Sequence, residues 1–346
     1  METTLSAWVE KEQQRLLADL TAWLKIPSIS TLPENTGDCR RAHQWIADRL
    51  SRLGFRVETI ETAGHPMVWA VGPEVRGAPT VLCYGHYDVQ PPDPLSAWVT
   101  PPFEPTVRKG KLYARGTADD KGQVFCIVSA IEALLATRGR LPVNMRFLIE
   151  GEEEVGSKGL TTFLTAQPER TEADAVLVPD VNMVAPGWPS VDVGLRGMVA
   201  AEIHVRTLQK DLHSGLYGGA APNAIETLWH LLERLKGPDG KIRIPGLYTR
   251  VKKPSARELK AWKALPIKEA AFRKEAGAKA LTGEKGFLFL ERVWSRPTFE
   301  VHGIVGGYMG AGYKTVVPAE ATAKVTLRLV PDQRGKEVAA LLQKAV

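Results

Sequence analysis

The sequence has few cysteines and no long apolar run. Its only cysteines are Cys39, Cys83 and Cys126, and no two of them form a CxxC pair. Three scattered cysteines are too few to staple a secreted fold, so we expect reduced thiols. No stretch approaches the ~20 apolar residues that a bilayer span needs, and the first residues lack the basic-then-apolar order of a signal peptide. The sequence therefore predicts a cytoplasmic protein that does not bind a membrane.

Long charge runs of one sign are also scarce. The chain has 45 Lys and Arg against 39 Asp and Glu, but the two signs are interleaved along its 346 residues. A surface that follows nucleic-acid phosphates usually shows a basic stripe, so we expect no nucleic-acid partner. The more basic stretch around 250–279 is interpreted as a solvated helical face. No serine lies in a GxSxG elbow, which argues against hydrolysis by a serine nucleophile.

The length predicts about two domains of ~150 residues each. Up to residue 194, predicted strands alternate with helices, which is typical of an α/β domain with a mostly parallel sheet flanked by helices. From residue 195 onward the pattern becomes that of a smaller α+β domain, with glycines at the boundary that suit a hinge. We therefore predict domains at 1–194 and 195–346. The predicted strands of the first domain are 55–61, 67–71, 80–85, 143–149 and 175–178, and its predicted helices are 1–25, 38–53, 120–138 and 157–166.

Histidine and acidic residues cluster where predicted strands end or a helix begins. The carboxyl ends of parallel strands meet at one edge of a sheet, so these side chains are expected to lie together. Several carboxylates gathered away from water are unfavourable without cations, which predicts a metal cluster. Mixed His and carboxylate ligands suit zinc, with manganese or cobalt as substitutes. The residues are His86 and Asp88 after strand 80–85, Asp119 and Asp120 before helix 120–138, Glu152–Glu154 after strand 143–149, and Asp180 after strand 175–178.

Spacing suggests roles for some of these residues. His86 and Asp88 lie on one face of an extended segment, so we assign His86 as a ligand and Asp88 as the carboxylate that fixes its tautomer. Paired Asp residues at a helix start are commonest as caps. Because this Asp pair is expected to face other acidic clusters, however, we assign Asp119 as the carboxylate that bridges two metal ions ~3.5–4 Å apart. In the acidic run Glu152–Glu154, one residue can bind metal and another can act as general base. Spacing does not show which glutamate has which role.

Seven segments together resemble a known family. The chain is similar to the co-catalytic zinc aminoacylase and exopeptidase superfamily, most closely to its cytosolic nonspecific dipeptidase and carnosinase branch. The resemblance implies a catalytic domain with an inserted lid and dimerisation domain. The segments run in the family's order: YGHYDVQP, GTADDKG, EGEEEVGS, VPD, DLHSGLYGG, YKTVVP and LRLVPD.

The resemblance also implies roles for individual residues of the first domain. His86 and Asp180 resemble the outer ligands of one zinc, and Asp119 resembles the carboxylate that bridges both zinc ions. Glu154 resembles a ligand of the second zinc, and Glu153 resembles the general base. The family further implies a cis peptide bond directly after the bridging aspartate.

In the lid, the resemblance points to three residues and to a partner. His213 resembles the residue that reaches the partner subunit's site and stabilises the oxyanion. Thr315 resembles a second contact of that kind, and Arg328 resembles the residue that grips the substrate carboxylate. The resemblance therefore implies a homodimer built on the lid domain.

The expected reaction is hydrolysis of a small peptide amide, most simply a dipeptide, by a metallopeptidase. An N-acyl amino acid is the alternative substrate with the same metal site. Relatives take a last His ligand and a substrate loop from a stretch after the lid, and this sequence ends at Val346. We therefore expect a fragment of a protein of ~450 residues. The alternatives are a truncated form with an impaired second metal site and a non-catalytic metal-binding or dimerising protein.

Overall fold

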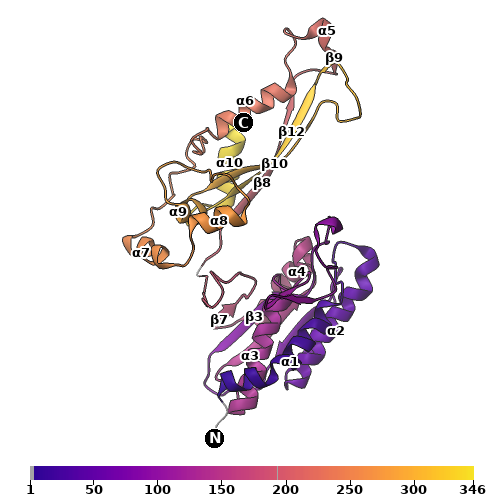
Figure 1. Cartoon of the computed structure of the whole chain (residues 1–346), viewed down its shortest axis with the longest axis vertical. Helices are drawn as coiled ribbons and strands as arrows, with labels where there is room; N and C mark the ends of the chain where they lie inside the picture. The colour runs from indigo at the N-terminus through magenta and orange to yellow at the C-terminus, as the bar shows by residue number, and fades with distance from the viewer. Residues whose placement is uncertain (1–3, 193) are drawn as a thin grey trace. The chain divides into compact units, whose positions relative to one another are not determined.

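The computed structural model describes residues 4–192 and 194–346, which form two compact units (Figure 1). The first unit comprises residues 1–182 and the second comprises residues 183–346. The predicted division between residues 194 and 195 falls inside the second unit. Each unit has its own hydrophobic core.

The first unit is built on a five-stranded mixed sheet in the order β1-β2-β6-β3-β7. Strand β3 pairs in parallel with both β6 and β7, whereas β1 pairs with β2, and β2 with β6, in antiparallel fashion. The predicted α/β class is confirmed, and the two antiparallel pairs make the sheet mixed. The strands are β1 (Arg56–Ile60), β2 (Met67–Val71), β3 (Thr80–His86), β6 (Asn144–Glu150) and β7 (Ala175–Leu177).

Helices cover both faces of this sheet. Helices α1 (Leu5–Leu24), α2 (Thr36–Arg52) and α3 (Lys121–Arg138) bury apolar side chains on one face, where they pack around strand residues such as Phe147 and Ile149. Helix α4 (Lys158–Ala166) places Phe163 against the other face, beside Trp69. Because both faces are covered, the central strands are apolar on both sides, which is why β3 reads as a continuous hydrophobic run.

Short elements complete the first unit. The two-stranded ribbon of β4 (Thr106–Arg108) and β5 (Lys111–Tyr113) turns at Lys109 and Gly110, which both have positive φ. Two positive φ values in a two-residue loop match the twist of a hairpin, and the glycine adopts such a value readily. Four short 3₁₀ helices lie in connections, at Pro33–Asn35, Leu95–Ala97, Glu153–Val155 and Pro168–Thr171.

The second unit has a three-stranded antiparallel sheet in the order β10-β12-β8. Helices α6 and α10 place apolar side chains in the core of this unit, among them Leu228 and Leu342. Asn223 caps α6 by accepting hydrogen bonds from the amides of Ile225 and Glu226, as a helix start requires. The elements are β8 (Met198–Arg206), α6 (Ala224–Leu235), β10 (Thr298–Gly306), β12 (Glu320–Arg328) and α10 (Gly335–Ala345).

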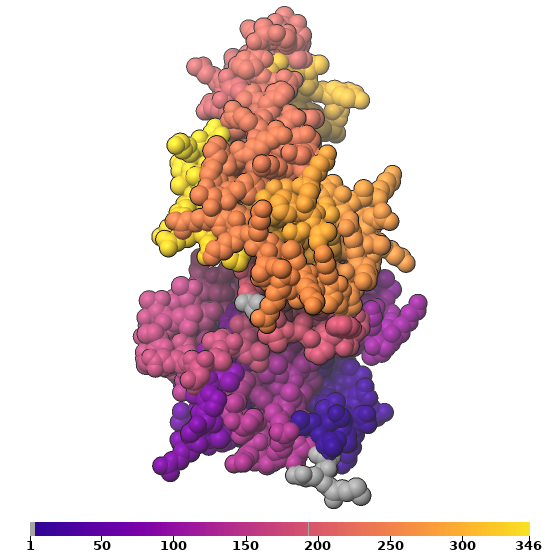
Figure 2. Space-filling model, turned by 90° about the vertical axis from the view of Figure 1, so that its left-hand side faces the viewer, coloured from indigo at the N-terminus to yellow at the C-terminus, as the bar shows by residue number. Residues whose placement is uncertain are grey.

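The remaining elements of the second unit are short. Helices α7 (Ala256–Ala264), α8 (Glu269–Glu275) and α9 (Phe289–Trp294) form the orange surface region in Figure 2. The basic stretch around 250–279, which the sequence predicts to be helical, contains two separate helices, α7 and α8, because Pro266 between them cannot continue a helix. The strands β9 (Leu212–His213) and β11 (Val316–Val317) pair with each other, next to helix α5 (Ser214–Tyr217). In the described part of the chain, no helix is both long and apolar enough to cross a membrane.

Candidate metal centre

The first feature of the site is a buried histidine at the end of a central strand. His86 closes β3, lies beside the last residue of β6 and is fully buried. Its Nδ1 lies 3.1 Å from the carbonyl oxygen of Asp88, and its Nε2 lies 3.1 Å from Asp119 Oδ1. A carbonyl oxygen only accepts hydrogen bonds, so Nδ1 carries the proton. Nε2 faces Asp119 instead, so it is the nitrogen that would bind a metal ion in exchange for its proton, with the ring held in place by Asp88.

One imidazole and two carboxylate side chains from distant segments converge at this point. The candidate metal centre consists of His86, Asp119 and Asp180, whose ligand atoms all lie within 4.8 Å of one another. Asp180 Oδ2 is 3.7 Å from His86 Nε2. The Asp119 side chain is 59% exposed, so one side of the centre is open to solvent and substrate. The structure therefore brings together three of the four ligands that the sequence analysis selected.

The electrostatics of this centre favour a positive charge. Burial lowers the pKa of His86, but the nearby carboxylates of Asp119, Asp180 and Asp88 outweigh burial and hold the pKa well above its ordinary value. The hydrogen bond from His86 lowers the pKa of Asp119 in turn, against a smaller opposing effect of burial. Two carboxylates facing one imidazole thus stabilise a cation between them. This nitrogen and oxygen donor set fits a divalent metal ion such as zinc.

The predicted fourth ligand lies in the loop that follows β6. Glu154 is not part of the three-residue centre, and its Oε2 accepts a hydrogen bond of 2.7 Å from Gln90 Nε2. Burial raises the pKa of Glu154, and the charge of Asp119 raises it further. Gln90 is a site residue that sequence reasoning missed, although its place in the same YGHYDVQP segment as His86 is a usable signal.

The neighbouring Glu153 has the properties expected of a proton acceptor. Burial raises its pKa, and the nearby charges of Glu154, Asp180 and Asp88 contribute in the same direction. A carboxylate with a raised pKa is a stronger base than an ordinary glutamate. The backbone amide of Glu153 binds Asp88, which also contacts the His86 ring, so the loop that carries Glu153 lies beside the candidate metal centre.

Asp88 connects His86 with the loop that carries Glu153 and Glu154, called the glutamate loop below. It is fully buried, and its Oδ1 lies 3.3 Å from His86 Nδ1. Its two oxygens also accept hydrogen bonds from the amides of Glu153 (3.3 Å) and Glu154 (3.2 Å). The sequence predicts only the contact between Asp88 and the histidine. The amide contacts depend on how the loop folds back onto β3, which spacing does not reveal.

Asp120 supports the same strand end from the start of α3. It is fully buried, and its Oδ2 accepts a hydrogen bond of 3.1 Å from the backbone amide of His86. Burial raises the pKa of Asp120 to about 7. Gly85 permits this approach, because a Cβ at that position would collide with Val124 and Asp120. The peptide bond between Asp119 and Asp120 is cis, which confirms the geometry that the family resemblance implied.

The three residues selected in the second unit do not all lie together. His213 ends β9, and its Nε2 lies 3.3 Å from Thr315 Oγ1. Its Nδ1 accepts a hydrogen bond from the amide of Gly215. Arg328 is the last residue of β12, whereas Thr315 comes just before β11, which precedes β12. His213 and Thr315 therefore form a pair, and Arg328 is separate from them along the strand.

Comparisons with known proteins agree with this arrangement. The profile of peptidase family M20/M25/M40 matches residues 82–336. The chain is 30% identical over 339 residues to human Beta-Ala-His dipeptidase, covering 94% of this chain and 67% of that protein. It is 30% identical over 351 residues to the Cys-Gly metallodipeptidase dug1 of Schizosaccharomyces pombe, covering 98% and 74% of the two chains.

A solved structure shows the same architecture. The M20 family metallo-carboxypeptidase Sso-CP2 from Sulfolobus solfataricus superposes with a TM-score of 0.83 at 33% sequence identity. The alignment covers 95% of this chain and 74% of the other. The residues matched by the family profile include the whole candidate metal centre, from His86 to Asp180. The chain therefore belongs to peptidase family M20/M25/M40.

Proposed function

We propose that this protein hydrolyses the peptide bond of a dipeptide with a free carboxylate. The observation that carries this proposal is the convergence of His86, Asp119 and Asp180 at one sheet edge, beside the raised-pKa carboxylate of Glu153. Relatives that are named dipeptidases, aligned along most of this chain, support the same substrate class. A cytoplasmic location stays a prediction of the sequence.

The proposed cofactor is a pair of divalent metal ions, zinc by preference. His86 and Asp180 would hold one ion, Asp119 would bridge both, and Glu154 would serve the second. When bound, the ions would polarise a water molecule and the scissile carbonyl group. The exposed Asp119 and the buried His86 suit this division, since one side of the centre is closed by protein and the other is open.

Glu153 is the proposed general base. Its carboxylate would remove a proton from the attacking water and then deliver that proton to the nitrogen of the leaving amine. The water oxygen forms a bond to the carbonyl carbon and the C–N bond breaks, so the products are a carboxylic acid and a neutral amine. Asp88 keeps Glu153 in reach by binding its backbone amide. His213 would stabilise the oxyanion with Thr315 as its neighbour, and Arg328 would bind the substrate carboxylate.

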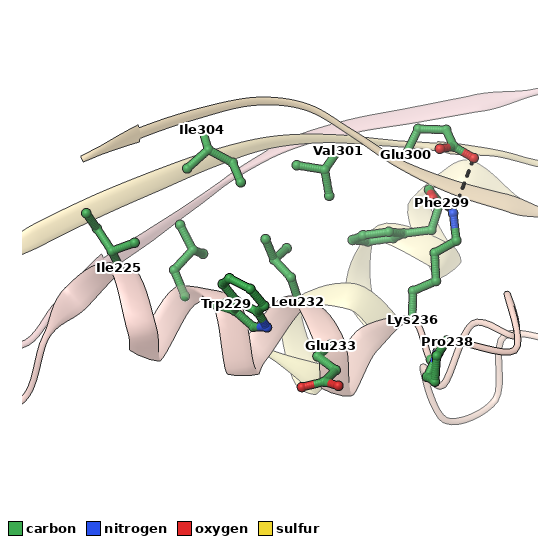
Figure 3. Close-up of a pocket in the computed structure, with 12 residues that line it drawn as sticks. Ile225, Trp229, Leu232, Glu233, Lys236, Pro238, Phe299, Glu300, Val301 and Ile304 are labelled. Carbon is green, nitrogen blue, oxygen red and sulfur yellow. Dashed lines mark hydrogen bonds and ion pairs between the residues drawn. The ribbon is translucent and has the colours of Figure 1, made fainter. Parts of the chain in front are cut away.

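We propose further that two copies assemble through the second unit. Strand β10 is an edge strand of its sheet, and an unpaired edge is a ready site for another chain. Next to it, β10 and α6 line an apolar groove of about 550 Å³, shown in Figure 3. Trp229 on α6 is 69% exposed and Ile304 on β10 is 55% exposed. A second copy would cover this groove, because its wall is mostly apolar and continues to the open strand edge.

Replacing the proposed base tests the function. We expect Glu153→Gln to abolish dipeptide hydrolysis by the metal-loaded protein and to leave the bound metal nearly unchanged. Thr165→Val on α4 removes an exposed hydroxyl and serves as the matched control. Near-normal turnover by Glu153→Gln would refute the base assignment. Preferential cleavage of N-acyl amino acids over a panel of dipeptides would refute the substrate class.

A further inference from the structure

A buried carboxyl group ties the loop that carries Glu153 to the strand that carries His86. Glu150, the last residue of β6, is 1% exposed. Its Oε1 accepts hydrogen bonds from Tyr84 Oη at 2.6 Å and from Ser157 Oγ at 2.9 Å. Tyr84 lies in β3, two residues before His86, and Ser157 ends the loop that contains Glu153. The proposed mechanism uses none of these three side chains.

The loop itself is held in an uncommon conformation. Gly156 and Ser157 have φ values of +95° and +52°. A positive φ is easy for glycine but unfavourable for serine, and such residues persist where surrounding contacts enforce them. The amide of Ser157 donates to the carbonyl of Glu152, and its hydroxyl donates to Glu150. The hydrogen bond to Glu150 therefore adds to the backbone hydrogen bonds that the amides of Val155, Gly156 and Ser157 donate within the turned loop.

Glu150 has little other support within the described residues. Its Oε2 is buried and has no hydrogen-bond partner there, so both of its side-chain hydrogen bonds go through Oε1. A buried carboxyl group with one unsatisfied oxygen is unfavourable for stability. Groups of this kind are retained at sites where geometry matters more than stability. The two hydroxyl groups fix where this carboxyl group lies.

We propose that Tyr84, Glu150 and Ser157 form a positioning cluster that sets the conformation of loop 151–157 and so aims the Glu153 carboxylate at the reacting centre. The cluster acts from one end of the loop, and Asp88 acts from its middle by binding the amides of Glu153 and Glu154. The proposal rests on the proposed function, because it takes Glu153 as the base. A misplacement of about 1 Å in such a group costs on the order of 10²-fold in rate.

Two mild substitutions test the cluster without opening a cavity in the core. Tyr84→Phe removes one hydroxyl and keeps the ring. Ser157→Gly removes the other hydroxyl and accepts the positive φ. We expect each to lower kcat for dipeptide hydrolysis by about 10-fold or more, with KM within about twofold and bound metal unchanged. Thr165→Val, which removes a hydroxyl bonded only to the carbonyl of Thr161 on α4, should match the unaltered protein.

A second readout does not depend on turnover. The amide protons of Glu153 and Glu154 are donated to Asp88, so a loosened loop should exchange them faster. We expect both variants to raise their hydrogen-exchange rates about 10-fold, whereas amides in the middle of β3 keep their protection.

The outcomes separate the cluster from the base. If kcat and the two exchange rates stay unchanged in both variants while Glu153→Gln is inactive, the cluster has no positioning role. The positioning role is also refuted if kcat falls only in proportion to a loss of bound metal, or if KM rises while kcat stays constant. An active Glu153→Gln overturns the proposed function instead, and the exchange rates then still decide whether the cluster holds the loop.

Discussion

Asp88→Asn is the substitution that most directly probes how the glutamate loop is held. The carboxylate of Asp88 accepts one backbone amide on each oxygen and is fully buried. An asparagine keeps the shape but replaces one acceptor by an NH₂ group, which then faces a backbone N–H. One charge-assisted hydrogen bond is lost and one buried donor is left without a partner. We expect unfolding of the first unit to become easier by about 2–4 kcal/mol.

The first unit can be followed separately, because every cysteine of the chain lies in it. Cys39 and Cys83 are at most 1% exposed, so they react with a thiol reagent only when this unit opens. In a Cys126→Ser background, the labelling of these two thiols across a urea series gives the stability of this unit alone. The free energy of unfolding is then compared, within that background, between the protein that keeps Asp88 and the protein that carries Asp88→Asn.

Asp174→Asn is the matched control. Asp174 also accepts a backbone amide, from Thr80 at 2.7 Å, but it is exposed and lies at the opposite end of β3. Its substitution should cost less than about 1 kcal/mol, since water can replace the lost acceptor. A loss for Asp88→Asn no larger than that of Asp174→Asn would show that the two amide contacts do not hold the loop.

Three further predictions concern stability and assembly. Burial lowers the pKa of His43, so the folded first unit favours the neutral ring and its stability should fall as the pH drops below about 6.5. In the thiol-labelling assay, His43→Leu should make the free energy of unfolding less dependent on pH. An unchanged pH dependence in this variant would contradict the role of His43. The side chain of Arg49 is 5% exposed and binds Asp19 on α1 and Glu132 on α3. Arg49→Met should therefore lower the free energy of unfolding of the first unit by about 3 kcal/mol. A change in this free energy within the error of the urea midpoints would rule out a structural role for these ion pairs. Trp229→Asp should convert the proposed dimer to a monomer in sedimentation, because it charges the apolar groove, whereas Glu233→Gln on the groove rim should not. A dimer that persists in Trp229→Asp would place the proposed contact elsewhere.

Much of the fold follows from local sequence patterns. The alternation of apolar strands with amphipathic helices predicts the order of elements in the first unit, and the strand ends predict where His86, Asp119 and Asp180 meet. That prediction works because parallel strands have a common carboxyl edge, whatever the details of packing. The antiparallel pairing of β1 and β2 is less visible, since a short connection between two strands does not by itself fix which neighbours they pair with.

The contacts around the glutamate loop were out of reach of sequence reasoning. The position of Glu150 at a strand end is visible, but its bond to Ser157 depends on a positive φ at a non-glycine residue, and its bond to Tyr84 depends on the pairing of β3 with β6. Spacing likewise left Glu153 and Glu154 equivalent, and only the family resemblance separated their roles. Their surroundings differ in the structure because the Glu154 carboxylate accepts a hydrogen bond from Gln90.

Metal binding by the purified protein tests the central claim most directly. After removal of all metal, equilibrium dialysis against zinc followed by elemental analysis gives the amount bound by the unaltered protein and by His86→Ala. The thiol-labelling assay verifies that the variant is folded. We expect the unaltered protein to bind zinc and His86→Ala to bind it at least about 100-fold more weakly, as loss of a ligand implies. Equal zinc binding by both proteins would contradict the assignment of His86, Asp119 and Asp180 as a metal centre.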